Sequence, residues 1–174
     1  MIEFNELKEK AKSIKTFGLG FIQIKLSNDT CVNVYLDNIN KFADADAPHS
    51  HQRSFESTIL CGNLTEYIYD VKMAHDGISA YCGCGNVDDP INHRYKYVLG
   101  EMFSYNTGDS YYRNKDDFHS VSALHGTITL IKKDISDVHD AIVISDSKGS
   151  VSYDKYDDAD LWDMVEMAFS NMVV

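Results

Sequence analysis

The chain has 174 residues, 44% of them hydrophobic, which is enough for one well-packed core and short for two, so we expect one domain over residues 1–174. Its 16 basic and 27 acidic residues give a formal net charge of −11 at pH 7. That charge argues against DNA or RNA as the main partner, because binding a phosphate backbone needs clustered Lys and Arg. The chain contains no run of 18 apolar residues, which is the length needed to span a membrane. Its charged N-terminus also lacks the apolar centre of a secretion signal, so we expect a cytoplasmic protein.

The first predicted elements are a helix and a β-hairpin. Apolar residues recur at helical spacing within residues 2–16, which predicts a short amphipathic helix. Residues 21–26 and 31–36 then alternate between apolar and polar types. Because the turn formers Ser, Asn and Asp at 27–29 separate these two runs, the pattern predicts a hairpin.

Further short strand-like runs follow, separated by turn formers. They are STILCG, LTEYIYDV, YKYVLGEMFSY, GTITLIKK and AIVISDS. Many short strands, two prolines and no interleaved helices predict a mainly all-β fold, an antiparallel sandwich or barrel over about residues 18–145. An apolar stripe then predicts a closing helix of about three turns over residues 159–171.

Two histidines, His49 and His51, stand two residues apart. In an extended chain, residues i and i+2 point to the same face, so both imidazoles can reach one metal ion at about 2.1 Å. The pair alone is a modest indication of a metal site, since two surface histidines give the same pattern.

Together with a third histidine, the pair resembles the two conserved motifs of the cupin superfamily. Residues 49–62, HSHQRSFESTILCG, are similar to the first motif, in which HxH is followed by Glu and then by a Gly that ends the next strand. Gly108 and His119, eleven residues apart, are similar to the second motif. The resemblance covers about residues 18–145 and implies an antiparallel double-stranded β-helix, the cupin or jelly-roll barrel. It also implies one divalent transition metal held by His49, His51 and His119.

The chain departs from the first motif by one residue, which leaves the role of Glu56 open. Counted from the histidines, Glu56 takes the place of the usual carboxylate ligand. Counted back from Gly62, Phe55 takes that place instead. Alternation along the strand does not decide between the two counts. We favour, by a narrow margin, the three-histidine site in which Glu56 points away from the metal.

Without a carboxylate ligand, the chain resembles the thiol dioxygenases, such as cysteine dioxygenase, in which an HxH segment also runs into a strand that ends in a Gly-Asn-Leu-like turn. Small uncharacterised cupin-like proteins of bacteria and phages are more similar still. The matching residues here are His49, His51, Phe55, Ser57, Ile59, Leu60 and Gly62. The resemblance implies a dioxygenase-like enzyme that acts on a small polar or anionic molecule, with iron preferred over nickel, manganese or zinc as the metal.

Four residues near the motifs are candidates for contacting a substrate. The guanidinium group of Arg53 or Arg113 could clamp a carboxylate or phosphate, although surface positions are the alternative for both. Tyr111 lies between the two ends of the second motif, and Ser57 faces inward if Phe55 does. The sequence assigns no catalytic residue.

The alternative function is a non-catalytic cupin that binds a small molecule or a protein, such as a phage accessory or counter-defence protein in the host cytoplasm. A bound transition metal with open coordination positions favours the enzyme. A filled or absent metal site beside a large apolar surface patch favours the binding protein. Homodimer formation is left open in both cases.

Overall fold

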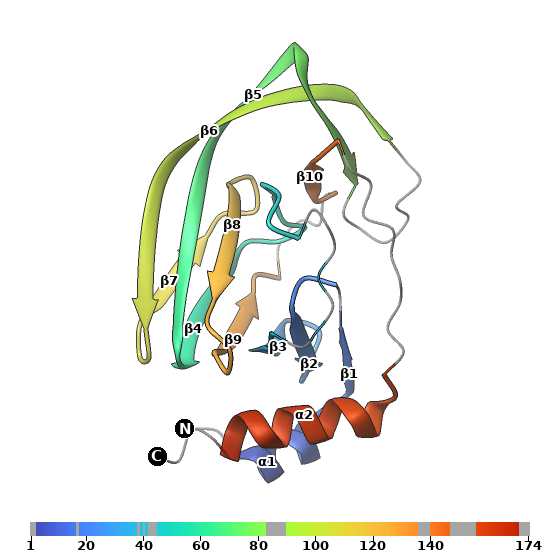
Figure 1. Cartoon of the computed structure of the whole chain (residues 1–174), viewed down its shortest axis with the longest axis vertical. Coiled ribbons are helices and arrows are strands. Elements are labelled where there is room, and N and C mark those ends of the chain that lie inside the picture. Colours follow the sequence, from blue (N-terminus) through green and yellow to red (C-terminus); the bar gives the residue numbers. More distant parts are fainter. Residues whose placement is uncertain are drawn as a thin grey trace.

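The computed structural model describes most of the chain, namely residues 3–16, 18–37, 39, 41, 45–82, 90–135, 140–146 and 156–170. Within these residues the chain forms two antiparallel sheets and two helices near its ends, α1 (Phe4–Lys10) and α2 (Asp158–Ser170), which lie together on one side of the sheets (Figure 1). The prediction of a mainly β protein with terminal helices is therefore confirmed, and α2 lies within one residue of its predicted bounds.

Six strands make up the first sheet. Their order is β1 (Ser13–Thr16), β2 (Phe21–Lys25), β3 (Thr30–Tyr35), β9 (Ile128–Lys133), β4 (Phe55–Cys61) and β7 (Ser110–Arg113). The second sheet has the order β10 (Ile142–Ile144), β5 (Asn63–Cys82) and β6 (Pro90–Asn106), and β8 (Phe118–Ala123) also pairs with β5. Every strand pair is antiparallel.

The helix predicted over residues 2–16 is too long, because its second half is a strand. The helix α1 ends at Lys10, and β1 pairs with β2 so that Ile14 stands opposite Ile24. Ile14 fits helical spacing, but its side chain is equally well buried from an edge strand, and it is only 6% exposed there. Pairing with β2 also satisfies backbone groups that would otherwise be left at the edge of the sheet.

The predicted closed barrel is not formed, because no strand of the first sheet pairs with a strand of the second among the described residues. The long strands β5 and β6 instead arch over the top of the molecule (Figure 1). In the pairing of these two strands, Met73 and Ile78 both stand opposite Tyr95, so residues 74–77 are extra on β5. Such a bulge bends a strand pair, and it carries the end of β5 to β10 instead of along the first sheet.

The first sheet is covered on both faces, which explains why β3 is buried at nearly every residue. One face packs with α1 and α2 around a cluster that includes Ile22, Val34 and Val165. The other face turns toward the second sheet, with Phe55 and Tyr111 in its cluster. Burial of both faces removes apolar area from water on each side, at about 25 cal/mol per Å².

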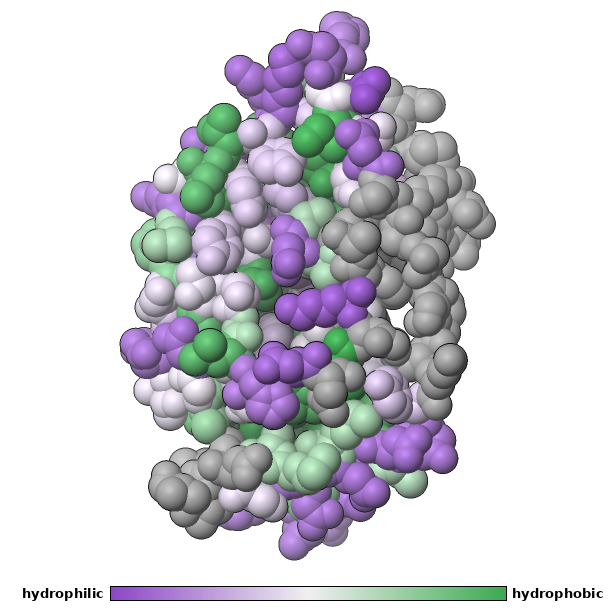
Figure 2. Space-filling model, viewed as in Figure 1, coloured by the Kyte–Doolittle hydropathy of each residue, from purple (hydrophilic) through white to green (hydrophobic). Residues whose placement is uncertain are grey.

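The surface is mixed in character. Residues 98–104 of β6 are exposed, and they include Val98, Leu99, Met102 and Phe103. On the face shown in Figure 2, hydrophobic side chains stand in separate places among hydrophilic ones. Neither α1 nor α2 is long and apolar enough to cross a membrane.

Gly62, which joins β4 to β5, gives a test of the packing between the sheets. Its φ is +86°, and an added Cβ would lie 2.6 Å from Thr127 Oγ1 and 2.8 Å from Thr127 Cα. Gly108 has a similar φ of +94° with no atom within 4 Å of an added Cβ. Gly108→Ala should therefore cost only backbone strain, about 1–3 kcal/mol, whereas Gly62→Ala should cost clearly more. Chemical denaturation of both variants measures this difference, and equal losses would contradict the close approach of Thr127.

Candidate metal centre

Backbone pairing turns three histidines toward one face. Residues 48–51 form an extended segment between β8 and β10. The His49 N–H donates to the His119 carbonyl at 2.9 Å, and the His119 N–H donates to the His49 carbonyl at 3.0 Å. Directly opposite residues of an antiparallel pair share a face, as do residues two apart in an extended chain. The backbone therefore places His51 on the same face as His49 and His119.

The three imidazoles form a nearly equilateral group. Their ring centroids are 5.0 Å apart for His49 and His51, 5.0 Å for His49 and His119, and 4.8 Å for His51 and His119. The possible ligand atoms of the three side chains all lie within 4.8 Å of one another. The Nε2 atoms of His51 and His119 are 2.6 Å apart. Two nitrogens at 90° around a metal, each about 2.1 Å away, would be roughly 3 Å apart, so a small rotation of the rings would admit an ion.

Hydrogen bonds at Nδ1 set the tautomers of His49 and His119, although the Nε2 of His119 also lies within hydrogen-bond distance of His51 Nε2. The Nδ1 of His49 lies 3.0 Å from the Ala47 carbonyl, and the Nδ1 of His119 lies 2.6 Å from Glu66 Oε1. Because a carbonyl and a carboxylate only accept, each Nδ1 carries the proton in the neutral ring. The lone pair of each ring is then on Nε2, where a metal ion can bind it. The donor set therefore fits a divalent transition metal.

Burial keeps the three rings neutral. It lowers the pKa of His49, although the Ala47 carbonyl acts in the opposite direction. Burial, followed by His49 and His119 and then the charges of Lys133 and Arg113, lowers the pKa of His51 well below the usual value. Burial, followed by His49 and Arg113, does the same for the pKa of His119. A neutral imidazole is the form that ligates metals, so the site needs no proton loss at pH 7 before it can bind an ion.

Behind His119 lies the carboxylate of Glu66, which is fully buried. The side chain of Arg113 approaches it in a fork, with Nε 3.0 Å from Oε1 and Nη2 2.7 Å from Oε2. The Tyr105 hydroxyl donates to Oε2 at 3.3 Å. Arg113 belongs to the first sheet and Glu66 to the second, so this ion pair joins the two sheets.

Phe55, not Glu56, lies beside the histidines. The Phe55 side chain is 6% exposed, and its ring centroid is 4.7 Å from that of His51. Glu56 is exposed on the other face of β4, in register with Lys132. The structure thus agrees with counting the first motif back from Gly62, and Glu56 is not part of the histidine cluster.

Of the four predicted substrate contacts, Arg113 already has partners within the protein. Arg113 is held by Glu66 and also donates to Asp117 at 3.3 Å. Arg53 lies just before β4, and its charge adds a small effect to the lowered pKa of Asp29, whose main cause is a hydrogen bond from Ser27. The guanidinium of Arg113 is therefore already paired, whereas contact of Arg53 with an anion stays a prediction.

The other two predicted contacts are packing residues between the sheets. Tyr111 stacks on Tyr105 with ring centroids 4.4 Å apart and lies 6.4 Å from the Phe55 ring, again between centroids. The side chain of Ser57 is fully buried and points to the same face of β4 as Phe55.

Glu66 is the site residue that the sequence reasoning missed. The run LTEYIYDV alternates, and Glu66 shares a face with Leu64, which is 1% exposed. A charge at an inward position is rarely found without a partner, so this position was a usable signal of a buried polar network.

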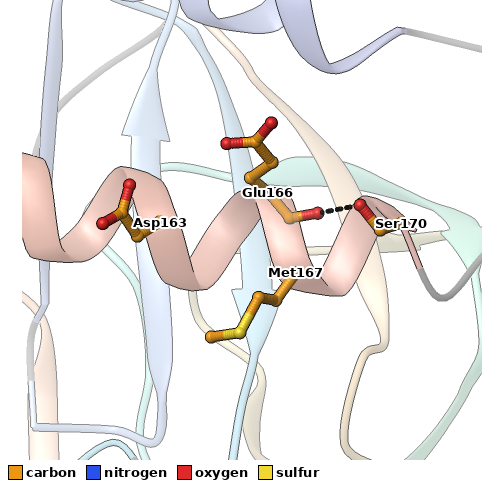
Figure 3. A pocket seen from close by; sticks show the side chains of 4 residues that line it. All are labelled: Asp163, Glu166, Met167 and Ser170. Atoms are coloured by element: carbon orange, nitrogen blue, oxygen red, sulfur yellow. Dashed lines mark hydrogen bonds between the residues drawn. The ribbon is translucent and has the colours of Figure 1, made fainter.

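A hollow along α2 lies apart from the histidines. Its lining residues are Asp163, Glu166, Met167 and Ser170 (Figure 3). The Ser170 hydroxyl donates to the Glu166 carbonyl one turn earlier at 2.9 Å, and the two carboxylates lie on the exposed face of the helix. Exposed acidic groups on a helix are ordinary, so this hollow gives no site.

Comparisons with known proteins add a distant likeness. No family model matches the chain, and no curated protein sequence matches it. The solved structure of KdgF from Halomonas sp. is similar to it, with 13% sequence identity over 76% of this chain and 86% of that chain, and a TM-score of 0.35.

The cluster predicts which side chains control metal affinity. His119→Ala removes one of three imidazoles and should weaken binding of Zn²⁺ by well over 10-fold, whereas Glu56→Gln should leave the affinity within about twofold of the unaltered protein. Isothermal titration of each variant measures both constants. Equal affinity for His119→Ala, or a 10-fold loss for Glu56→Gln, would contradict the three-histidine assignment.

The lowered pKa values predict how stability depends on pH in the metal-free protein. Below the usual pKa of about 6.5, the unfolded chain takes up protons that the buried rings do not. The free energy of unfolding should therefore hold above pH 6.5 and fall as the pH is lowered from 7 to 5. A His51→Gln variant should fall less steeply over the same range. Denaturant titrations at several pH values measure both slopes, and constant stability down to pH 5 would contradict neutral buried rings.

Proposed function

We propose that this chain is a cupin-like protein that binds one divalent transition metal through the Nε2 atoms of His49, His51 and His119. The observation that supports this most directly is the convergence of three neutral imidazoles, two of them with Nδ1 already bonded to an acceptor. Metal-ligating histidines in proteins have this arrangement, in which the second nitrogen is held by a carbonyl or carboxylate.

The proposed centre has three protein ligands. Among the described residues, no carboxylate or thiol joins the histidine cluster. Since Fe(II), Ni(II), Mn(II) and Zn(II) take four to six ligands, one to three positions remain for water or for a small molecule. When bound, such a metal supplies Lewis-acid chemistry or, with iron, a place for O₂ to react. An enzyme acting on a small polar or anionic molecule is therefore the function we propose.

Around the metal position, the chain's own residues set what can enter. The Phe55 ring packs against His51 and, at 6.0 Å between centroids, against His119, which makes that side of the site apolar. The charge of Arg113 is already matched by Glu66. Recognition of an anionic group would thus fall to the metal itself. The resemblance to thiol dioxygenases makes iron our first choice of metal.

Metal analysis of protein purified without chelator or polyhistidine tag tests the binding part of the proposal. We expect about one transition-metal ion per chain in the unaltered protein and almost none in a His51→Ala variant, since three imidazoles form one site. Equal metal content in the two proteins would contradict the proposal.

Open coordination is tested separately on protein loaded anaerobically with Fe(II). Nitric oxide should bind the iron and give an adduct visible by electron paramagnetic resonance, because only a vacant or water-filled position can accept it. Iron that binds stoichiometrically but takes up no nitric oxide would indicate a filled site and would count against an enzyme.

A further inference from the structure

The Glu66 carboxylate has its accepting positions filled. Oε1 accepts from His119 Nδ1 at 2.6 Å and from Arg113 Nε at 3.0 Å. Oε2 accepts from Arg113 Nη2 at 2.7 Å and from the Tyr105 hydroxyl at 3.3 Å. A carboxylate offers about four lone-pair sites, so these four donors leave none for a metal ion. Glu66 can therefore influence the metal position only through His119.

We propose that Glu66 is a positioning residue of the metal centre: its carboxylate selects the His119 tautomer that bears the proton on Nδ1 and so presents Nε2 to the metal. The importance of this tautomer for metal binding rests on the function proposed above, whereas its selection by Glu66 does not. A neutral imidazole has two tautomers, and the one that is populated follows the hydrogen bond made by the other nitrogen.

Arg113 offsets the energetic cost of burying the Glu66 carboxylate in the protein interior. A buried carboxylate without a partner is costly, and a forked arginine both matches its charge and fixes its plane. Arg113 is itself only 14% exposed and is held from the far side by Asp117. The carboxylate is thus fixed by the first sheet before it acts on His119 in the second.

The pairing of β8 with β5 in the second sheet explains why the Glu66 side chain reaches Nδ1 of His119. His119 stands directly opposite Ile68 in the pairing of β8 with β5, and Glu66 lies two residues before Ile68. Diagonal neighbours on one face of an antiparallel pair are within reach of long side chains. The contact is therefore set by strand register.

Two double variants separate positioning from mere ion pairing. The acceptor-free variant, Glu66→Met with Arg113→Met, removes both charges and leaves nothing to accept from His119 Nδ1. The acceptor-retaining variant, Glu66→Gln with Arg113→Met, removes the same two charges but keeps an amide oxygen where Oε1 was. Both should fold, since replacing a buried ion pair by uncharged groups of similar size is often neutral for stability. Amide proton–nitrogen correlation spectra of both variants check that they are folded.

The first readout is the His119 tautomer in the metal-free protein, from long-range proton–nitrogen correlation spectra of histidine-labelled samples. We expect the Nδ1–H tautomer in the unaltered protein and in the acceptor-retaining variant. We expect a substantial Nε2–H population in the acceptor-free variant. A Tyr105→Phe control, which removes only the longest of the four contacts, should leave the tautomer unchanged.

The second readout is the affinity for Zn²⁺ by titration. The acceptor-free variant should bind about 10- to 100-fold more weakly than the unaltered protein, and the acceptor-retaining variant should bind within a few-fold of it. If both variants keep the Nδ1–H tautomer, or both lose it equally, the positioning role of Glu66 is overturned. If the unaltered protein does not bind Zn²⁺, the proposed function fails, while the tautomers still decide what Glu66 does.

Discussion

A fully buried carboxylate must be surrounded by donors if a chain is to fold around it, because removing an unpaired charge from water costs several kcal/mol. In this protein the carboxylate is that of Glu66, on β5. Its donors come from three further strands: Tyr105 on β6, Arg113 on β7 and His119 on β8. Four strands from two sheets thus have to meet at one point. This arrangement places His119 beside the two histidines of the 48–51 segment, about 5 Å from each between ring centroids.

The backbone of the 48–51 segment positions two of the three histidines of the proposed metal centre. It lies between β8 and β10, and its hydrogen bonds to both are made by backbone atoms and the Ser50 hydroxyl, so none of them involves a histidine ring. The imidazole rings are therefore not needed to hold the segment in place, and they can bind a metal ion instead. Phe55 closes one side and lowers the local polarity, which favours neutral imidazoles. Packing between the sheets therefore fixes both the geometry and the protonation of the site.

Much of this arrangement could be predicted from the sequence, because it follows local patterns. Alternation predicted most of the strands, though not β7 or β8, and the apolar stripe predicted α2. The spacing of His49, His51 and His119 singled out the residues that the structure brings together. The strand at residues 13–16 could not be separated from the preceding helix, because Ile14 suits either pattern and only its pairing with β2 decides.

The remaining differences depend on long-range contacts. Closure of a barrel depends on where β5 bends, and that bend arises from the extra residues 74–77, which no local pattern reveals. The role of Arg113 depends on a partner 47 residues earlier in the chain, so a guanidinium predicted to bind a substrate is instead part of the scaffold. Glu66 itself was visible only as a charge at an inward position of an apolar strand.

X-ray absorption spectroscopy of the protein loaded with one equivalent of Zn²⁺ tests the central claim most directly, because it reports the atoms around the metal. We expect imidazole nitrogens at about 2.0–2.1 Å, three to each metal ion, with oxygen completing the shell. A shell containing sulfur at about 2.3 Å, or one of oxygen atoms without imidazole scattering, would contradict it.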